Sequence, residues 1–284
     1  MRNLYSVLLL VVFSFIMKAE VSTSEKKALV KLYKATNGMN WTSKWDLNAP
    51  VSTWYGVELK EDKVVSIQLS DNNLVGVLPA DISDLVYLKN LNLYKNSISG
   101  IIPSTIGKMK SLESLNLAFN KISGNLPITI CEASSLKKVE LYMNGISGNI
   151  PAEIGKLTKL ETLSLYNNAI EGQIPSSLYG LKNLKVLYLN SNSISGTLSS
   201  SVSNLTNLQQ LSLFDNKLRG QVPVDLEKLN HLKELNISYN QFSGTVSRYL
   251  LKLDGLNMTM INEKGITEAL KAHMDKNTAV ASED

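Results

Sequence analysis

The sequence predicts an α/β repeat solenoid, and three observations lead to that prediction. An asparagine recurs every 24 residues without a slip, a glycine follows each of these asparagines by four positions, and seven apolar positions recur with the same period. A fixed period of roughly 20 to 50 residues is the signature of stacked structural repeats. Each unit is too small to bury its own apolar face, so neighbouring units must stack to form a continuous core.

Eight such units run from residue 64 to residue 255. A proline lies three positions after the glycine in six of the eight units, and Ser199 and Ser247 take its place in the other two. The first three apolar columns have the spacing L-x-x-L-x-L, which favours a short strand, and the later columns favour a looser helical or 3₁₀ segment. All 56 column positions are apolar, the weakest being Ala133, so the assignment does not depend on any single motif.

The asparagine column has a physical reason. A coil that turns after a buried strand leaves backbone N–H and C=O groups without partners, which is unfavourable. An inward asparagine amide offers two donors and an acceptor to those groups. Surface turn asparagines are the alternative, but one constant register disfavours it. The expected structural ladder consists of Asn72, Asn96, Asn120, Asn144, Asn168, Asn192, Asn216 and Asn240.

The repeat pattern L-x-x-L-x-L-x-x-N-x-[IL]-x-G-x-[IL]-P resembles the leucine-rich repeat of the plant-specific class. That class occurs in plant receptor ectodomains, in polygalacturonase-inhibitor proteins and in secreted proteins of bacteria and protists. The resemblance implies a right-handed horseshoe or superhelix with a parallel β-sheet on the concave face and irregular segments on the convex face. It is specific for the fold and nearly silent on the partner.

Residues 1–19 have the layout of a secretory signal peptide. A short basic start at Arg2 precedes a 14-residue apolar run that ends at Lys18. The run is shorter than the roughly 20 residues that a membrane-spanning helix needs. An uncleaved anchor is the alternative. We expect cleavage near Ala19, no membrane span after signal removal, and a secreted or extracellular protein, which in a bacterium includes the periplasm or the cell surface.

Residues 20–63 are predicted to form an N-terminal cap. Ser22 and Glu25 have the spacing of a capping box that begins a helix. Three tryptophans follow and are expected to cover the first coil, the alternative being a carbohydrate-binding platform; they are Trp41, Trp45 and Trp54. The stretch A-L-x-x-L-Y-x-A-T-N-G-x-N-W is similar to the disulfide-free caps of secreted bacterial and protist members. Plant receptor caps carry paired cysteines instead.

Residues 256–284 are predicted to form a C-terminal cap and a polar tail. Residues 257–261 continue the apolar alternation of the last unit. Residues 266–276 favour a short amphipathic helix with Ile266, Leu270 and Met274 facing inward. No second globular domain is expected in this segment.

Composition excludes several function classes. The 29 basic residues and 25 acidic residues nearly balance, so no basic field for nucleic acid is expected. One cysteine, Cys131, and two histidines rule out a disulfide framework or a cysteine-rich zinc site and leave little for acid–base chemistry. No phosphate-binding glycine loop, G-x-S-x-G or H-E-x-x-H occurs. We therefore expect no catalytic residue, no metal, no cofactor and no enzyme activity.

The residues that flank the inward leucines of each strand should line the concave sheet. Aromatic side chains gather at these positions, and we predict them as the ligand-binding residues: Tyr94, Phe119, Tyr142, Tyr166, Tyr188, Phe214 and Tyr239. Polar positions are interleaved with them, at Asn92, Asn116, Glu140, Ser164, Asn190, Ser212 and Asn236. Tyrosine among small polar groups is typical of protein and glycan interfaces. The alternative is that the aromatic side chains only cover the strands and bind no ligand. The charged residues around them, Glu234 among them, favour a solvated rim rather than a docking surface.

These observations predict a secreted, non-catalytic binding module that recognises a protein or glycan partner through the concave sheet. One alternative is an inhibitor of an extracellular glycan-degrading enzyme, and another is a surface recognition or adhesion protein. An ice-binding solenoid would need a flat threonine-rich array, which the sequence does not show.

Overall fold

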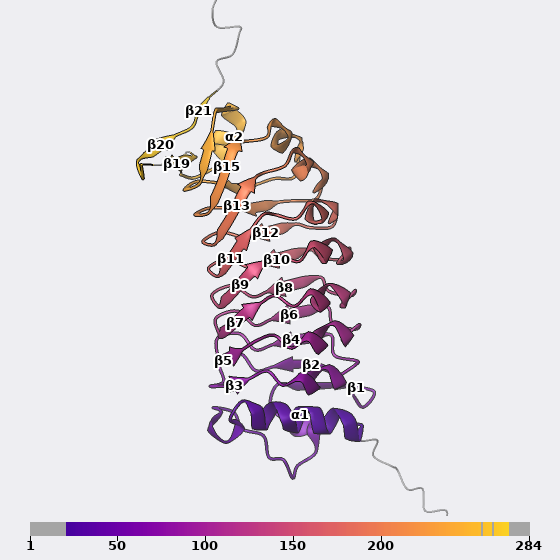
Figure 1. Cartoon of the computed structure of the whole chain (residues 1–284). Helices are drawn as coiled ribbons and strands as arrows, with labels where there is room; N and C mark the ends of the chain where they lie inside the picture. Colours follow the sequence, from indigo (N-terminus) through magenta and orange to yellow (C-terminus); the bar gives the residue numbers. More distant parts are fainter. Residues whose placement is uncertain (1–20, 257, 263, 273–284) are drawn as a thin grey trace, which may run out of the picture.

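The computed structural model describes residues 21–256, 258–262 and 264–272 of the 284-residue chain. Within these residues the chain winds into a stack of coils, with two long sheets along the stack and short helical segments beside them (Figure 1). This architecture confirms the predicted α/β repeat solenoid. The predicted signal peptide, residues 1–19, and the last part of the predicted tail lie outside the described residues.

The concave sheet has nine strands, of which the N-terminal cap contributes the first and the eight repeats one each. Neighbouring repeat strands pair in parallel with a register offset of one 24-residue unit, so Leu163 lies between Val139 and Leu187. Only the first pair, β1 with β2, is antiparallel. In sheet order the strands are β1 (Val57–Lys60), β2 (Lys63–Gln68), β4 (Asn90–Asn92), β6 (Ser114–Asn116), β8 (Lys138–Glu140), β10 (Thr162–Ser164), β12 (Val186–Tyr188), β14 (Gln210–Ser212) and β16 (Glu234–Asn236).

The seven apolar columns form one continuous core that extends along the whole stack. Every column residue is buried except Leu253 in the last unit, which is partly buried against the same core. Each coil covers the apolar face of the next coil. The stack therefore excludes water from its interior, although no single repeat contains a long hydrophobic segment.

A second parallel sheet of eight strands follows the asparagines, and the sequence did not predict it. Its strands end within one residue of the recurring glycine, whose φ is positive, as at Gly172 (φ 74°), where the side chain of Asn149 from the preceding coil occupies the space of a Cβ. In sheet order they are β17 (Gln241–Ser243), β15 (Lys217–Gln221), β13 (Ser193–Thr197), β11 (Ala169–Gly172), β9 (Gly145–Asn149), β7 (Lys121–Asn125), β5 (Ser97–Gly100) and β3 (Val75–Val77).

Short 3₁₀ helices make up the convex side, which is more regular than the resemblance implied. A proline precedes most of them because its fixed φ suits the residue before a helical turn. They are η3 (Ala80–Asp84), η4 (Ser104–Lys108), η5 (Ile128–Glu132), η6 (Ala152–Lys156), η7 (Ser176–Gly180), η8 (Ser200–Asn204) and η9 (Val224–Lys228). The eighth unit has the α-helix α2 (Arg248–Leu253) in their place.

The N-terminal end of the stack is covered by α1 (Thr23–Ala35) and by two 3₁₀ turns, η1 (Gly38–Asn40) and η2 (Val51–Thr53). Ser22 caps α1 as predicted, since its Oγ accepts a hydrogen bond from the backbone N–H of Glu25 at 3.2 Å. The Glu25 carboxylate is buried and accepts from the backbone N–H of Val64 at 3.0 Å. Glu25, the second residue of the capping box, therefore also joins the N-terminal cap to the first repeat strand.

The three cap tryptophans are buried rather than displayed as a platform. Their rings form a contiguous cluster with Tyr33, with centroids between 4.8 and 5.9 Å apart. Each indole N–H donates to a backbone carbonyl, as Trp41 does to Thr36 at 2.9 Å. This satisfied, buried arrangement excludes the carbohydrate-platform alternative for Trp41, Trp45 and Trp54.

The C-terminal prediction was wrong in one respect. Residues 266–272 do not form a helix: β20 (Thr267–Ala269) pairs antiparallel with β19 (Thr259–Ile261), and β21 (Lys271–Ala272) pairs with β18 (Thr245–Val246). The last coil presents unpaired backbone groups, and strand pairing satisfies them where a helix would not. Ile266 is 57% exposed instead of inward, whereas Leu270 packs on the core. Met274 lies outside the described residues.

Candidate functional site on the concave sheet

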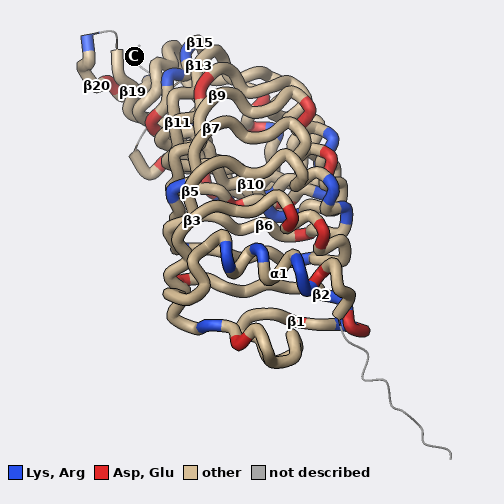
Figure 2. The backbone as a smooth tube through the Cα atoms, turned by 60° about the horizontal axis from the view of Figure 1, so that its bottom comes forward, with Lys and Arg blue, Asp and Glu red and all other residues tan. Residues whose placement is uncertain are grey.

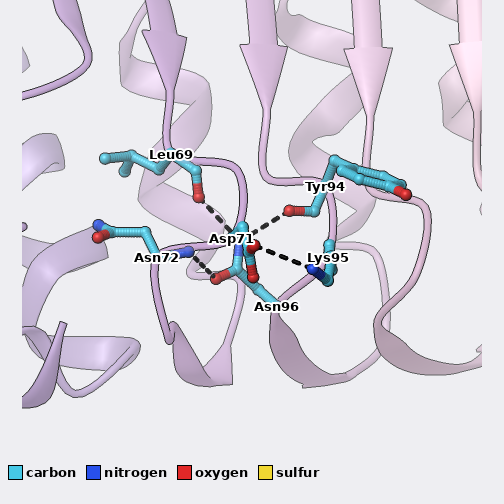
Figure 3. A network of polar contacts seen from close by, with 6 residues as sticks. All are labelled: Leu69, Asp71, Asn72, Tyr94, Lys95 and Asn96. Atoms are coloured by element: carbon cyan, nitrogen blue, oxygen red, sulfur yellow. Dashed lines mark hydrogen bonds and ion pairs between the residues drawn. The ribbon is translucent and has the colours of Figure 1, made fainter. Parts of the chain in front are cut away.

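The asparagine amides link each coil to the one before it, and this linkage holds the concave strands in register. The Nδ2 of Asn96 donates to the carbonyl oxygen of Leu69 at 2.8 Å, and its Oδ1 accepts from the backbone N–H of Asn72 at 3.0 Å (Figure 3). The same amide also donates to the carbonyl oxygen of Leu93 at 3.0 Å and accepts from the backbone N–H of Leu74 at 2.9 Å. Asp71 also receives a hydrogen bond from the ammonium of Lys95 at 3.0 Å.

The same geometry recurs along the stack. For Asn120, Asn144, Asn168, Asn192, Asn216 and Asn240, Nδ2 donates to two or three carbonyl oxygens, and Oδ1 accepts from a backbone N–H of the previous coil at 2.9 to 3.0 Å. Asn72, the first of the series, binds the cap instead, because its Oδ1 accepts from the N–H of Ser43 at 2.7 Å.

The residue before each asparagine adopts a left-handed backbone conformation, with φ between 51° and 59°. In this region asparagine, aspartate and glycine are favoured, and Asp71, Asn167 and Asp215 fit that preference. Phe119 and Tyr239 do not: bulky side chains are strained there by about 1–2 kcal/mol each. Their rings are also 40% and 37% exposed, so this strain places two aromatic rings in solvent.

The seven predicted aromatic residues lie in two groups of touching rings. Tyr94 contacts Phe119 (centroids 5.8 Å apart), and both contact Tyr142 at 6.4 Å. Tyr142 stacks on Tyr166 at 4.4 Å with nearly parallel rings, and Tyr166 meets Tyr188 edge to face at 6.5 Å. The second group is Phe214 with Tyr239, at 5.1 Å. We call these seven residues the aromatic track.

The middle of the aromatic track is desolvated. Burial, with smaller contributions from Tyr166 and Glu140, raises the pKa of Tyr142 to about 12, and burial also raises the pKa of Tyr166 and Tyr188. Ser164, the last residue of β10, is 3% exposed, and its hydroxyl has no hydrogen-bond partner among the described residues. A partly buried aromatic centre of this kind resembles the core of a protein interface.

A depression of about 370 Å³ separates the two aromatic groups. It exists because the large Tyr188 on β12 is followed by the small Ser212 on β14 in the same sheet column. Its lining consists of Tyr166, Tyr188, Asn190, Leu211, Ser212, Glu234, Leu235 and Asn236. The sequence predicts most of these polar residues as neighbours of the track. It did not lead to the prediction of a hollow, although the change from the large Tyr188 to the small Ser212 in the same column indicates one.

Charges along the stack are mixed in sign (Figure 2). On the concave sheet, Glu140 is paired with Lys138 at 2.9 Å and accepts a hydrogen bond from the amide of Asn116 at 3.1 Å. On the flank of the same sheet, Glu113 lies between Lys137 at 2.6 Å and Lys89 at 3.9 Å. The Lys137 ammonium lowers the pKa of the Glu113 carboxyl. Such pairs between successive coils reinforce the register of the stack.

Residues with reactive side chains are placed away from the track. Cys131 is buried among the convex residues, and burial raises the pKa of its thiol to about 11, which suits an inert filler. His231 is on the surface. Within the described ranges, no group of three or more His, Cys, Asp or Glu side chains could hold a metal ion. None of the helices formed by those residues has the length and apolar character needed to traverse a lipid bilayer.

Two family models match the chain. The model described as "Leucine-rich repeat region" matches residues 129–263, and the one described as "Leucine rich repeat" matches residues 62–122. Together with the stacked coils and the asparagine ladder, these matches define the class: the chain belongs to the leucine-rich repeat proteins. None of the curated proteins matches it.

Solved structures of plant receptors share this architecture. The ectodomain of the Arabidopsis receptor kinase HAESA, in complex with an extended IDA peptide hormone, is 31% identical (TM-score 0.73) over 84% of this chain and 40% of that one. The receptor of the PEPR1–AtPEP1 complex is 29% identical (TM-score 0.75) over 85% of this chain and 34% of that one. The chain therefore spans less than half the length of either receptor.

A plant ice-binding protein is similar in size to this chain. It is 22% identical, with a TM-score of 0.58, and the match covers 90% of this chain and 99% of that one. At this identity the likeness concerns the fold alone.

Proposed function

We propose that the protein is a non-catalytic binding module that holds an extracellular protein or glycan partner on the concave sheet. The observation that carries this proposal is the run of touching aromatic rings on the outward face of the sheet. A structural role for these residues would require only that they cover the strands. The strained Phe119 and Tyr239 exceed that requirement, since asparagine would adopt the same left-handed backbone at either position without this strain.

The physical character of the track fits recognition. Rigid aromatic rings lose little conformational freedom on binding, and the desolvated centre around Tyr142 and Tyr166 resembles the region where binding energy is concentrated in interfaces. Polar groups of neighbouring strands surround it and can exclude or bridge water. The likeness to a receptor kinase ectodomain solved with a peptide hormone supports a role in recognition.

Affinity capture from the native medium tests the proposal. The immobilised wild type should retain a partner that the Tyr142→Ala/Tyr166→Ala double variant loses. The matched control is Tyr249→Ala, which removes an exposed ring from the convex helix α2. Thermal melts establish that all three proteins are folded. Equal capture by the double variant and the wild type would place the binding surface elsewhere.

We also infer the chain organisation on which this function depends. Residues 1–19 act as the export signal, residues 20–63 as the N-terminal cap, residues 64–255 as the repeats, and residues 256–284 as the C-terminal cap and tail. The protein is then secreted, or in a bacterium is periplasmic or held at the cell surface. N-terminal sequencing of the exported protein should give a start near Glu20. A start at Met1 would contradict the export signal.

A further inference from the structure

The depression between the two aromatic groups has an acidic group without a cationic partner. Glu234 on β16 is exposed at the edge of the depression, and its Oε2 accepts one hydrogen bond, from the amide of Gln210 at 2.8 Å. Within the described residues, no lysine, arginine or histidine lies within ion-pair distance of Glu234. The other concave carboxylate of the central repeats, Glu140, is neutralised by Lys138 at 2.9 Å.

The walls of the depression suit a long cationic side chain. The floor is formed by β14 and β16 at Leu211 and Leu235, whose side chains are buried in the core, so the rings of Tyr166 and Tyr188 are the apolar surface against which an aliphatic stem can lie while its charged end stays outside. Tyr166 and Tyr188 form one side, and aromatic rings attract a cation electrostatically. Burial raises the pKa of Tyr188, and the nearby Glu234 carboxylate raises it further.

We infer that this depression is a subsite for an arginine side chain of the partner, and hence that the partner is a protein or peptide and not a neutral glycan. The inference rests on the proposed function, because it places the subsite within the concave binding face. A guanidinium fits better than an ammonium, since its planar donors match a carboxylate and it also stacks on aromatic rings. The stem lies against the rings of Tyr166 and Tyr188, and the head group reaches Glu234 and the amide oxygens of Asn190 or Asn236. A neutral glycan would leave the Glu234 charge uncompensated.

Selection from a phage-displayed library of random peptides tests the inference with a defined probe. Peptides selected on the wild type should share an arginine. Replacing it with citrulline, which is neutral and nearly isosteric, should weaken binding about tenfold, and the Glu234→Gln variant should weaken binding of the arginine peptide by a similar factor. Both changes together should weaken binding no further than either alone, because they remove the same contact.

The matched control is Glu227→Gln, which removes an equal charge from the convex helix η9 and should leave affinity unchanged. Selected peptides without a basic residue, or penalties that simply add, would overturn the subsite. The Tyr142→Ala/Tyr166→Ala variant separates the two levels of the account. If peptide binding needs the tyrosines but not Glu234, the subsite alone is wrong. If it needs neither, the concave binding face is wrong as well.

Discussion

The side-chain Oδ1 of Asn168 accepts a hydrogen bond from the backbone N–H of Ile146, one coil earlier, at 3.0 Å. The same amide donates to the carbonyl oxygens of Leu141 at 3.1 Å and Leu165 at 2.9 Å. One side chain therefore bonds backbone groups in two coils, and each of the two carbonyl oxygens also accepts from the neighbouring ladder amide, Asn144 or Asn192. This relationship, repeated along the stack, positions the strands that carry the aromatic track.

Replacing Asn168 with alanine should lower the free energy of unfolding by about 1–3 kcal/mol, because the Ile146 N–H loses its side-chain acceptor and the Leu141 and Leu165 carbonyl oxygens each lose one of two amide donors. Urea denaturation monitored by circular dichroism measures this change. The control is Asn183→Ala, which removes one exposed hydrogen bond to the carbonyl of Thr158 and should cost less than about 0.5 kcal/mol. Equal stability of Asn168→Ala and the wild type would contradict the ladder account.

Replacing Phe119 with asparagine should separate stability from binding. Relief of left-handed strain, about 1–2 kcal/mol, offsets the loss of ring contacts with Tyr94 and Tyr142, about 0.5–1.5 kcal/mol. We expect the free energy of unfolding to change by less than about 1.5 kcal/mol while partner capture falls. Ile101→Asn, at an exposed apolar residue that directly follows β5, is the control and should leave capture intact. A Phe119→Asn protein that captures normally would argue for structural filling.

The sequence predicts the stack well because its period is exact and its columns are chemically uniform. Asn168 and its equivalents could be assigned a role from spacing and from the hydrogen-bonding capacity of an amide. The second sheet could not be predicted, because its strands are three to five residues long and depend on pairing with the next coil rather than on local preference. The prediction of a helix from Ile266 onward was wrong. The apolar spacing of this segment suits a helix, but the open end of the stack favours strand pairing.

The aromatic track was found from the sequence because alternation along a strand identifies the outward positions. Its division into two groups was not, since that depends on ring orientations and on the small Ser212 beside the large Tyr188. The left-handed backbone at Phe119 and Tyr239 also escaped the pattern, because most residues at that position in the other repeats are small or polar.

Glu113 should contribute a small, pH-dependent stability. Its pKa is lowered in the folded protein by the Lys137 ammonium, so the unfolded chain binds a proton first as the pH falls. The contribution is therefore present above the unfolded value near pH 4.5 and is lost as the pH falls through the lower folded pKa. Because the pair is partly exposed, Glu113→Gln should lower stability by less than about 1 kcal/mol at pH 7.

Thermal melts of Glu113→Gln and the wild type between pH 7 and pH 3 should converge as the acid range is entered, and high salt should narrow the gap at pH 7. Glu171→Gln, an exposed carboxylate of the second sheet, serves as the charge-matched control. A gap that persists unchanged at pH 3 would show that the effect of Glu113 is not electrostatic.

Ionisation of the Tyr142 phenol should lower the free energy of unfolding at alkaline pH. Its pKa is raised to about 12 in the folded protein from an ordinary value of 10.0, mainly by burial. The unfolded phenol ionises first as the pH rises, so the stability contribution of the neutral ring is present below pH 10 and is lost between pH 10 and about pH 12. Denaturation curves of the wild type and Tyr142→Phe over this range should diverge, with the phenylalanine variant losing less stability. Parallel curves would show that the ring is solvated.

Site-specific photo-crosslinking is the most direct test that the aromatic track is the binding surface. A benzoylphenylalanine placed at Phe119 should cross-link the captured partner on irradiation, and one placed at Tyr249 on the convex helix α2 should not. Cross-links at position 249 without any at position 119 would contradict the account.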